Sequence, residues 1–188
     1  MSKDDRRHWD RRHAEAGMEP TGRPPPVFAG FERLFPVEGR ALEIACGRGA
    51  TVVWLAGRGM EVLGVDVSPV AIDLARELAL LNGVDDRCRS EVHDLDEGLP
   101  AGRAVDLLLC HMFRDRRLDQ PMMERLAPGG LLAVAALSEV GGGSGQFRAV
   151  RGELRVSFEP LEVIAEGEGD GVAWFIGRRP DRPSLALG

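Results

Sequence analysis

The sequence predicts an α/β fold with a mostly parallel sheet. Apolar strand-like runs alternate with helix-like segments from residue 41 to residue 137, which is typical of parallel strands joined by crossover helices. The runs at 104–112 and 131–137 are apolar without strict alternation, as expected for strands buried on both faces. The C-terminal stretch 160–180 instead holds two strand-like runs around Asp170-Gly171, a typical hairpin turn. Five alternating strands and this antiparallel hairpin predict seven strands in total.

Local signals mark where the individual elements begin and end. Ser68 and Pro69 are typical of a helix start and Gly83 of a helix end, so they bound the best defined helix. The first five strands are predicted at 41–45, 60–67, 87–94, 104–112 and 131–137. The helices between them are predicted at 50–59, at 68–83 and from near Pro121 to the stop at Pro128-Gly129-Gly130. Before them, residues 1–38 contain a thinly amphipathic helix, a Pro-rich connector and a short second helix. We expect residues 1–38 to form a helical lid and linker, and residues 39–188 the main part of a single globular domain.

Composition and charge argue against several classes of protein. The formal net charge of −6 argues against a general nucleic-acid binder, because phosphate contacts need a concentrated positive face. No apolar run approaches the roughly 18 residues of a membrane span, and the charged N-terminus lacks the apolar core of a secretory signal. The three cysteines are scattered and indicate neither a disulfide framework nor a metal site. We therefore expect a cytoplasmic protein without nucleic-acid, membrane or metal partners.

The stretch ALEIACGRGA at 41–50 ends a strand in small residues and predicts a ligand site. A turn after the first parallel strand lies at the carboxyl edge of the sheet, where Gly47 and Gly49 allow close approach to an anionic or nucleotide-type ligand. Asp66 lies about twenty residues further on, where a carboxylate can accept hydrogen bonds from ribose hydroxyls. The turn therefore favours an adenosine ligand, and a glycine turn needed only for tight packing is the alternative.

Two adenosine ligands fit this pattern, a dinucleotide and S-adenosylmethionine. The dinucleotide fingerprint Gly-x-Gly-x-x-Gly requires glycine at position 52, or at both 45 and 50. The sequence has Val52, Ala45 and Ala50 at these positions. A nicotinamide-dependent oxidoreductase is therefore the weaker interpretation.

Several motifs occur in the order found in a known family. Glu43-Ile44-Ala45-Cys46-Gly47-Arg48-Gly49 resembles the first motif of class I S-adenosylmethionine-dependent methyltransferases, and Val65-Asp66-Val67-Ser68 resembles the second. His93-Asp94-Leu95 and the run from Val105 to His111 are similar to the third and fourth, and Pro128-Gly129-Gly130 also matches the family. The resemblance covers about residues 39 to 178. It implies a Rossmann-like methyltransferase domain at 39–188 that uses S-adenosylmethionine.

The resemblance assigns expected roles to individual residues. Glu43 would accept from the methionine ammonium, Asp66 from the ribose and Asp94 from the adenine amino group, while Val67 and Leu95 would enclose the adenine ring. A solvated loop acid is the alternative for Asp94. The complete set of expected cofactor-binding residues is Glu43, Ala45, Cys46, Gly47, Gly49, Asp66, Val67, Asp94, Leu95 and Cys110. Ala45 departs from the family, which commonly has glycine at this position.

The layout also resembles small bacterial methyltransferases of the tellurite-resistance and thiopurine type. In that group a short N-terminal helix with a Trp-Asp pair and a following Arg folds over the cofactor, similar to Trp9-Asp10-Arg11-Arg12 here. The resemblance implies that Trp9 and Arg12 belong to a lid near the substrate.

Methyl transfer to a small molecule is the function that these features predict. Alignment of the acceptor with an already activated methyl group requires no dedicated catalytic residue for a soft or anionic acceptor. His111 follows the fourth strand and is the candidate general base for a neutral acceptor, with a locally hydrogen-bonded histidine as the alternative. The Asn-Pro-Pro-Tyr type of motif is absent after Leu109, which argues against DNA adenine or glutamine amide acceptors. A monomer or homodimer is expected, and a non-catalytic S-adenosylmethionine-binding protein is the alternative function.

Overall fold

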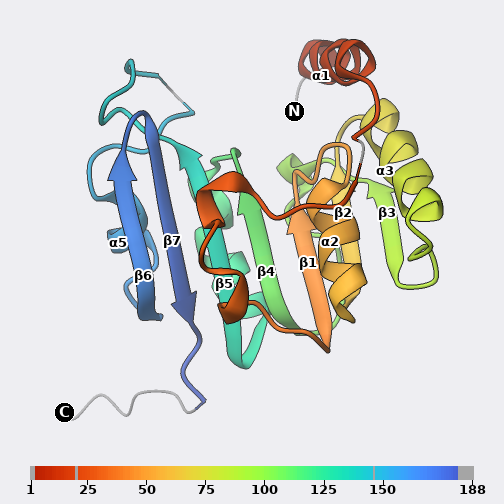
Figure 1. Cartoon of the computed structure of the whole chain (residues 1–188). Coiled ribbons are helices and arrows are strands. Elements are labelled where there is room, and N and C mark those ends of the chain that lie inside the picture. Colours follow the sequence, from red (N-terminus) through yellow and green to blue (C-terminus); the bar gives the residue numbers. More distant parts are fainter. Residues whose placement is uncertain (1–2, 20, 146, 182–188) are drawn as a thin grey trace. The chain divides into compact units, whose positions relative to one another are not determined.

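The computed structural model describes residues 3–19, 21–145 and 147–181, and the chain divides into two compact units (Figure 1). The first unit extends to Gly102 and the second begins at Arg103. Each unit contains several strands of a sheet and the helices that pack on them. No helix among the described residues is long and apolar enough to cross a membrane.

The first unit contains three parallel strands in the order β3-β2-β1. The strands are β1 (Arg40–Ile44), β2 (Glu61–Asp66) and β3 (Cys88–Val92), and the helices are α1 (Lys3–Ala16), α2 (Ala50–Arg58) and α3 (Pro69–Leu81). Short 3-10 turns occupy Pro26–Phe28, Glu32–Leu34 and Leu95–Glu97. Ile44 is in register with Val65, and Asp66 with Val92, so the carboxyl ends of all three strands lie at one edge.

Helix α3 begins and ends where the sequence predicts. The Ser68 hydroxyl accepts a hydrogen bond from the Ala71 amide at 3.1 Å, and Pro69 occupies the first helical position. Gly83 follows the helix with a positive φ of 65°, which glycine adopts at little steric cost. Apolar residues of β1, α2 and α3, among them Leu42, Leu55 and Ile72, are almost completely buried and form the core of this unit.

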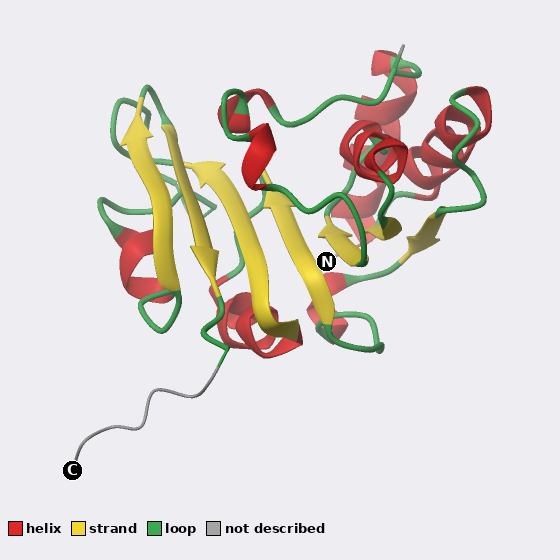
Figure 2. Cartoon of the chain, turned by 60° about the horizontal axis from the view of Figure 1, so that its bottom comes forward, coloured by secondary structure: helices red, strands yellow, loops and turns green. Residues whose placement is uncertain are grey.

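The second unit contains four strands in the order β4-β5-β7-β6. Its elements are β4 (Val105–His111), α4 (Asp119–Arg125), β5 (Leu126–Leu137), α5 (Glu153–Ser157), β6 (Glu162–Gly169) and β7 (Val172–Arg178). β4 and β5 are parallel, whereas β7 pairs antiparallel with both β5 and β6 (Figure 2). The turn between β6 and β7 is Asp170-Gly171, both with positive φ, as expected for a tight hairpin. The predicted fold class, α/β with seven mostly parallel strands and a C-terminal antiparallel hairpin, is confirmed.

The start of β5 differs from the prediction. The sequence suggests a helix that continues to the Pro128-Gly129-Gly130 stretch and a strand from residue 131, but α4 ends at Arg125 and β5 begins at Leu126. The stretch is instead an irregularity within the strand, because the register with β4 shifts between Val105 and Leu107. A Cβ atom on Gly130 would lie 2.8 Å from the Ala127 carbonyl oxygen, so a side chain is excluded here.

A buried ion cluster ties the loop after β4 to α5. Arg114 is only 5% exposed, and its guanidinium donates to an Asp119 oxygen at 2.8 Å, to Glu153 at 2.7 Å and to the Ser157 hydroxyl at 3.1 Å. Burial acts to raise the pKa of Glu153, but hydrogen bonds from Arg116, the Val150 amide and Arg114 hold it below its ordinary value. Arg114 is therefore the buried cation for both acids, and Glu153 also pairs with the half-exposed Arg116 at 2.6 Å.

We expect the variant Arg114→Met to lose about 3 to 5 kcal/mol of unfolding free energy, because two acids lose their buried cation. Urea denaturation of this variant and the wild type measures the loss. Arg117→Met is the matched control, since the Arg117 side chain is 65% exposed and pairs with Asp115 in its own loop, and it should change stability by less than about 1 kcal/mol. Equal stability of the two variants would contradict this account.

Candidate functional site

The glycine turn after β1 combines a closely packed position and an open one. Gly49 has a φ of 79°, and a Cβ there would lie 2.6 Å from the Ala75 Cβ, so this glycine allows α3 to pack against the turn. Gly47, with a φ of 53°, would meet only the His13 Cε1 at 3.5 Å. Tight packing, the alternative interpretation of the turn, therefore explains Gly49, whereas at Gly47 only the positive φ favours glycine.

Ala45 adopts the conformation that explains why the family commonly has glycine there. Its φ is 52°, which lies in the left-handed region that residues with a Cβ atom enter at a cost of roughly 1 to 2 kcal/mol. Alanine in place of glycine therefore adds backbone strain at this position, and the contacts of the surrounding turn must offset it.

Asp66 links the turn after β1 to the turn after β2. One carboxylate oxygen accepts from the Gly47 amide and the other from the Ser68 amide, each at 2.9 Å. Asp66 is 8% exposed and Val67 beside it is buried. Since each carboxylate oxygen has a second lone pair, Asp66 retains acceptor capacity for a ligand.

Glu43, at the fourth position of β1, has a carboxylate oxygen that receives no hydrogen bond from the described residues. The carboxyl group is 3% exposed and is hydrogen-bonded by the Thr51 hydroxyl and the Val52 amide from the first turn of α2. No hydrogen bond reaches its Oε2 within the described part of the chain. Burial raises the pKa of Glu43 from 4.5 to about 8, and the nearby Asp66 charge acts in the same direction.

An orphaned buried oxygen of this kind is expected to receive a donor from a ligand, because an unsatisfied buried acceptor is costly. A cationic amino group suits it best, since a cation would also stabilise the ionised carboxyl. The methionine ammonium of S-adenosylmethionine therefore fits the chemistry of Glu43.

Asp94 and Leu95 follow β3 at the same edge of the first unit. Asp94 accepts from the Asp96 amide at 3.0 Å and begins the 3-10 turn at Leu95–Glu97. Leu95 is buried, and the His93 amide donates to the Asp66 carbonyl oxygen at 2.9 Å. The structure thus brings the acids from the ends of β1, β2 and β3 to one edge of this unit.

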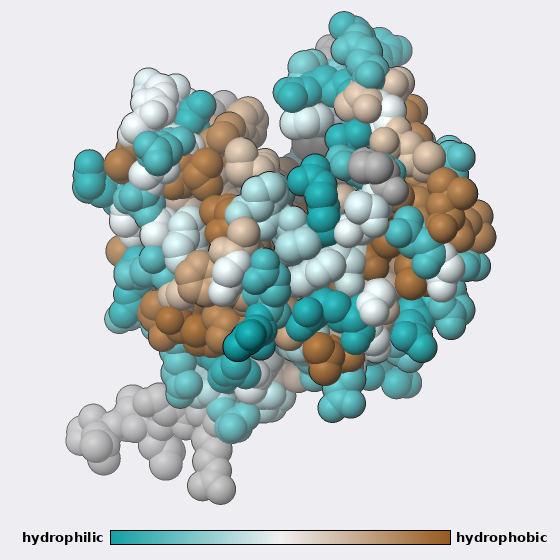
Figure 3. Space-filling model, viewed as in Figure 1, coloured by the Kyte–Doolittle hydropathy of each residue, from teal (hydrophilic) through white to brown (hydrophobic). Residues whose placement is uncertain are grey.

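Helix α1 contacts this edge through polar residues. The Ser68 hydroxyl donates to an Asp10 oxygen at 2.5 Å, and His13 lies against Gly47. The predicted lid residues Trp9 and Arg12 are exposed, and the Arg12 guanidinium lies 5.3 Å from the centre of the Trp9 ring. The visible surface of α1 is accordingly mostly hydrophilic (Figure 3).

Arg48, in the glycine turn, forms hydrogen bonds with the C-terminal end of α1. Its guanidinium donates to the carbonyl oxygens of Ala16 at 3.2 Å and Gly17 at 2.6 Å, and pairs with Glu19 at 2.6 Å. Burial is the main cause that lowers the pKa of His13 below its ordinary value, which favours the neutral imidazole beside the turn.

Cys110 and His111 lie at the carboxyl end of β4 in the second unit. Cys110 is 2% exposed, and its thiol donates to the Phe113 carbonyl oxygen at 3.4 Å. His111 is half-buried, and the following Met112 has a positive φ of 59°. The chain therefore bends sharply immediately after the candidate base.

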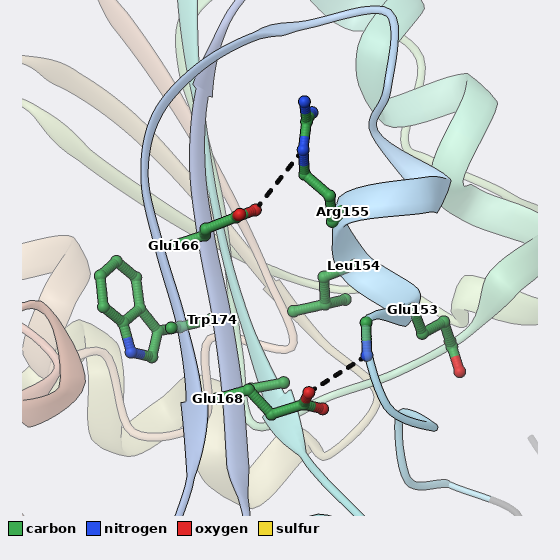
Figure 4. Close-up of a pocket in the computed structure, with 9 residues that line it drawn as sticks. Glu153, Leu154, Arg155, Glu166, Glu168 and Trp174 are labelled. Carbon is green, nitrogen blue, oxygen red and sulfur yellow. Dashed lines mark hydrogen bonds and ion pairs between the residues drawn. The ribbon is translucent and has the colours of Figure 1, made fainter.

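A separate pocket of about 300 Å³ lies in the second unit between α5, β6 and β7 (Figure 4). Its acids already have partners. Glu168 accepts from Ser138 Oγ at 2.8 Å and from the Gly152 amide at 3.1 Å, and Glu166 pairs with Arg155 at 3.8 Å. None of the predicted site residues lines this pocket. Among the residues described, no group of three or more His, Cys, Asp or Glu is arranged to hold a metal ion.

The sequence analysis did not place His13, Ser68 and Thr51 in the site, although each contacts a predicted site residue, and it did not predict the contact of Asp10 with Ser68. The spacing of Asp10 and His13, one helical turn apart, was a usable signal for a common face. The role of Thr51 had no local signal, because it depends on how α2 packs against β1.

Comparisons with known proteins agree with the motifs. Residues 41–130 match the family described as a methyltransferase domain. The chain is 30% identical over 104 residues to the mitochondrial ubiquinone biosynthesis O-methyltransferase of Schizosaccharomyces pombe, which covers 53% of this chain and 38% of that protein. It is 47% identical over 38 residues to the thiopurine S-methyltransferase of Pseudomonas fluorescens, covering 20% of this chain and 18% of that protein.

Solved structures show the same fold at low identity. TehB from Haemophilus influenzae superposes with a TM-score of 0.73 at 16% identity, over 83% of this chain and 62% of that one. The CcbJ methyltransferase from Streptomyces caelestis has a TM-score of 0.69 at 16% identity, over 84% of this chain and 91% of that one. The chain spans about a third to a half of the length of the first curated relatives that it matches. Residues 41–130 thus match a methyltransferase domain in sequence, and the predicted resemblance to class I S-adenosylmethionine-dependent methyltransferases is confirmed.

Proposed function

We propose that this protein is an S-adenosylmethionine-dependent methyltransferase that acts on a small molecule in the cytoplasm, as a monomer or homodimer. The observation that carries the proposal is the buried Glu43 Oε2, which receives no hydrogen bond from the described residues and lies in the same unit as Gly47 and the Asp66 carboxylate. These groups suit a ligand with an ammonium at one end and ribose hydroxyls at the other. The bound cofactor supplies a methyl group already activated on a sulfonium.

The residues of this chain would bind and orient the cofactor. Glu43 is suited to accept from the ammonium, Asp66 from the ribose and Asp94 from the adenine amino group, while Gly47 leaves room for the ligand beside the backbone. Ala45, Cys46, Gly49, Val67, Leu95 and Cys110 complete the proposed cofactor-binding set. The protein then contributes mainly by aligning the acceptor with the methyl group and by excluding water from the site.

Two considerations support a small acceptor. The ubiquinone relatives and the 2-heptyl-1-hydroxyquinolin-4(1H)-one methyltransferase of Mycobacteroides abscessus, 36% identical over 63 residues, are named for small organic acceptors. The net charge of −6 opposes binding to a phosphate backbone, although one relative is named as an RNA methyltransferase. The structural neighbour SpnF is titled a [4+2]-cyclase, so the fold by itself leaves the reaction open.

We further propose that residues 1–38 are a lid and linker. The supporting contacts are those of Asp10 with Ser68, of His13 with Gly47 and of Arg48 with the end of α1. Because these contacts are polar and the described side chains of α1 are exposed or half-buried, α1 can separate from the turn at low cost and admit the cofactor. Trp9 and Arg12 remain candidates for contact with the acceptor from their exposed positions.

The ribose assignment predicts that Asp66→Asn weakens binding of S-adenosylhomocysteine by about 10-fold or more, because hydrogen bonds to a charged acceptor are worth about 1.5 to 3 kcal/mol. Isothermal titration of the purified protein measures this change. Asparagine is preferred to alanine because it keeps the size of the side chain and an acceptor for one of the two backbone amides that Asp66 binds, whereas alanine would remove both acceptors. Asp73→Asn, on an exposed carboxyl of α3, is the control and should bind like the wild type. Unchanged affinity in Asp66→Asn would remove the assignment.

The lid proposal predicts that Asp10→Ala exposes α1 to trypsin, because the helix loses its bond to Ser68. Cleavage after the arginines of α1 should be several-fold faster than in the wild type, and S-adenosylhomocysteine should slow it less. Glu15→Ala changes an exposed residue of the same helix and serves as the control. Identical cleavage of all three proteins would argue against a lid held by Asp10.

The proposed role of His111 predicts a selective loss of turnover. With a panel of thiol, hydroxyl and anionic acceptors, His111→Asn should lower kcat by about 100-fold for a neutral hydroxyl acceptor and little for a soft anionic one. Affinity for S-adenosylhomocysteine should stay within about twofold. Equal losses for both acceptor types would assign His111 to structure, and no product from any acceptor would favour a non-catalytic cofactor-binding protein.

A further inference from the structure

Glu43 occupies a position that disfavours a negative charge in the empty protein. Its carboxyl group is 3% exposed, and the Asp66 carboxylate contributes a repulsive charge. The thiol of Cys46 is the other titratable group nearby, and burial raises the pKa of that thiol well above its ordinary value, so it stays uncharged. Within the described part of the chain, α2 provides two hydrogen-bond donors to Glu43, the Thr51 hydroxyl and the Val52 amide, and both are uncharged.

The hydrogen bonds on Glu43 leave one oxygen available. Thr51 and Val52 donate to the carboxyl group, yet Oε2 receives no hydrogen bond from any described residue. A proton on this group removes the cost of an unpaired buried charge. A ligand cation at Oε2 removes the same cost in another way, by pairing with the charge.

We propose that Glu43 exchanges a proton with solvent when the cofactor binds, being a neutral carboxylic acid in the empty protein and a carboxylate in the complex. This inference rests on the proposed function and adds a linked proton to it. On binding, the O–H bond of Glu43 breaks, its proton passes to the buffer, and the electron pair left on the carboxylate accepts a hydrogen bond from the ligand ammonium. Thr51 acts as the positioning residue, since its hydroxyl stabilises the ionised form.

The direction of the pH dependence follows from this exchange. Below the pKa of about 8 that burial gives Glu43, the empty protein must release a proton to bind, so affinity for S-adenosylhomocysteine rises with pH. The expected slope is about 10-fold in affinity per pH unit between pH 6 and 7.5, and the slope flattens near pH 8. The stability of the empty protein depends on pH in the opposite direction. The contribution of neutral Glu43 to the free energy of unfolding is complete below pH 4.5 and is lost as pH rises through about 8.

Isothermal titration at pH 6.5 in two buffers of different ionisation enthalpy counts the protons released. We expect close to one proton for the wild type with S-adenosylhomocysteine. Glu43→Gln should release none, and its affinity should be nearly independent of pH. 5′-Methylthioadenosine lacks the amino-acid part, so its binding should release no proton from any of these proteins.

The variants Thr51→Val and Thr51→Ser test the positioning role. Thr51→Val keeps the shape but removes the hydroxyl, so affinity at pH 6.5 should fall about 10-fold and the pH at which affinity levels off should move upward. Thr51→Ser should restore both, which a purely structural role of the side chain would not predict.

Three outcomes would overturn the inference. These are binding of S-adenosylhomocysteine by the wild type without proton release, proton release that persists in Glu43→Gln, and a loss in Thr51→Val that is equal at every pH. The first of these would leave the proposed cofactor intact. A complete failure of the wild type to bind S-adenosylhomocysteine would overturn the proposed function together with this inference.

Discussion

The two hydrogen bonds of Asp66 are the interaction on which the candidate site depends. The carboxylate joins the Gly47 amide after β1, nineteen residues before Asp66 in sequence, to the Ser68 amide after β2, and so fixes the two loops relative to each other. Parallel strands place these loops at the same edge, and the shared acid sets their separation. The open backbone at Gly47 and the first turn of α3 are therefore positioned by one side chain, before any ligand is present.

Glu43 and Asp66 illustrate how two acids in one small unit can differ in chemistry. Asp66 has backbone donors on both oxygens, whereas Glu43 has donors for only part of its carboxyl group. Both acids are less than a tenth exposed, so the number of N–H and O–H donors that reach each carboxyl group, more than exposure, distinguishes them. Each oxygen of Asp66 has one backbone donor and can accept a second hydrogen bond, whereas Oε2 of Glu43 has no donor among the described residues.

The sequence predicts the fold well wherever local signals and long-range packing agree. The alternation of strands and helices, the start of α3 at Ser68 and the hairpin turn at Asp170-Gly171 are all found. The early start of β5 was missed because Pro128-Gly129-Gly130 is a typical helix stop, and only pairing with β4 makes it an irregular part of a strand.

Asp66 could be predicted from its position at the end of the second strand, and Glu43 and Asp94 from the family resemblance, but the hydrogen bonding of these acids could not. Whether an oxygen of Glu43 lacks a donor depends on the packing of α2, and α1 carried too weak an amphipathic pattern to predict its inward face. The structure directs Asp10 and His13 toward the turn, while Trp9 and Arg12 remain exposed.

The hydroxyl of Ser68 has a consequence for how the cofactor enters and leaves. It accepts from the Ala71 amide to cap α3, and it donates to Asp10 of α1. These two bonds use opposite capacities of one hydroxyl group, so departure of α1 leaves the cap of α3 in place. If α1 is the lid that we propose, exchange of the bound molecule requires only local opening of this helix and leaves the elements that hold the rest of the site folded.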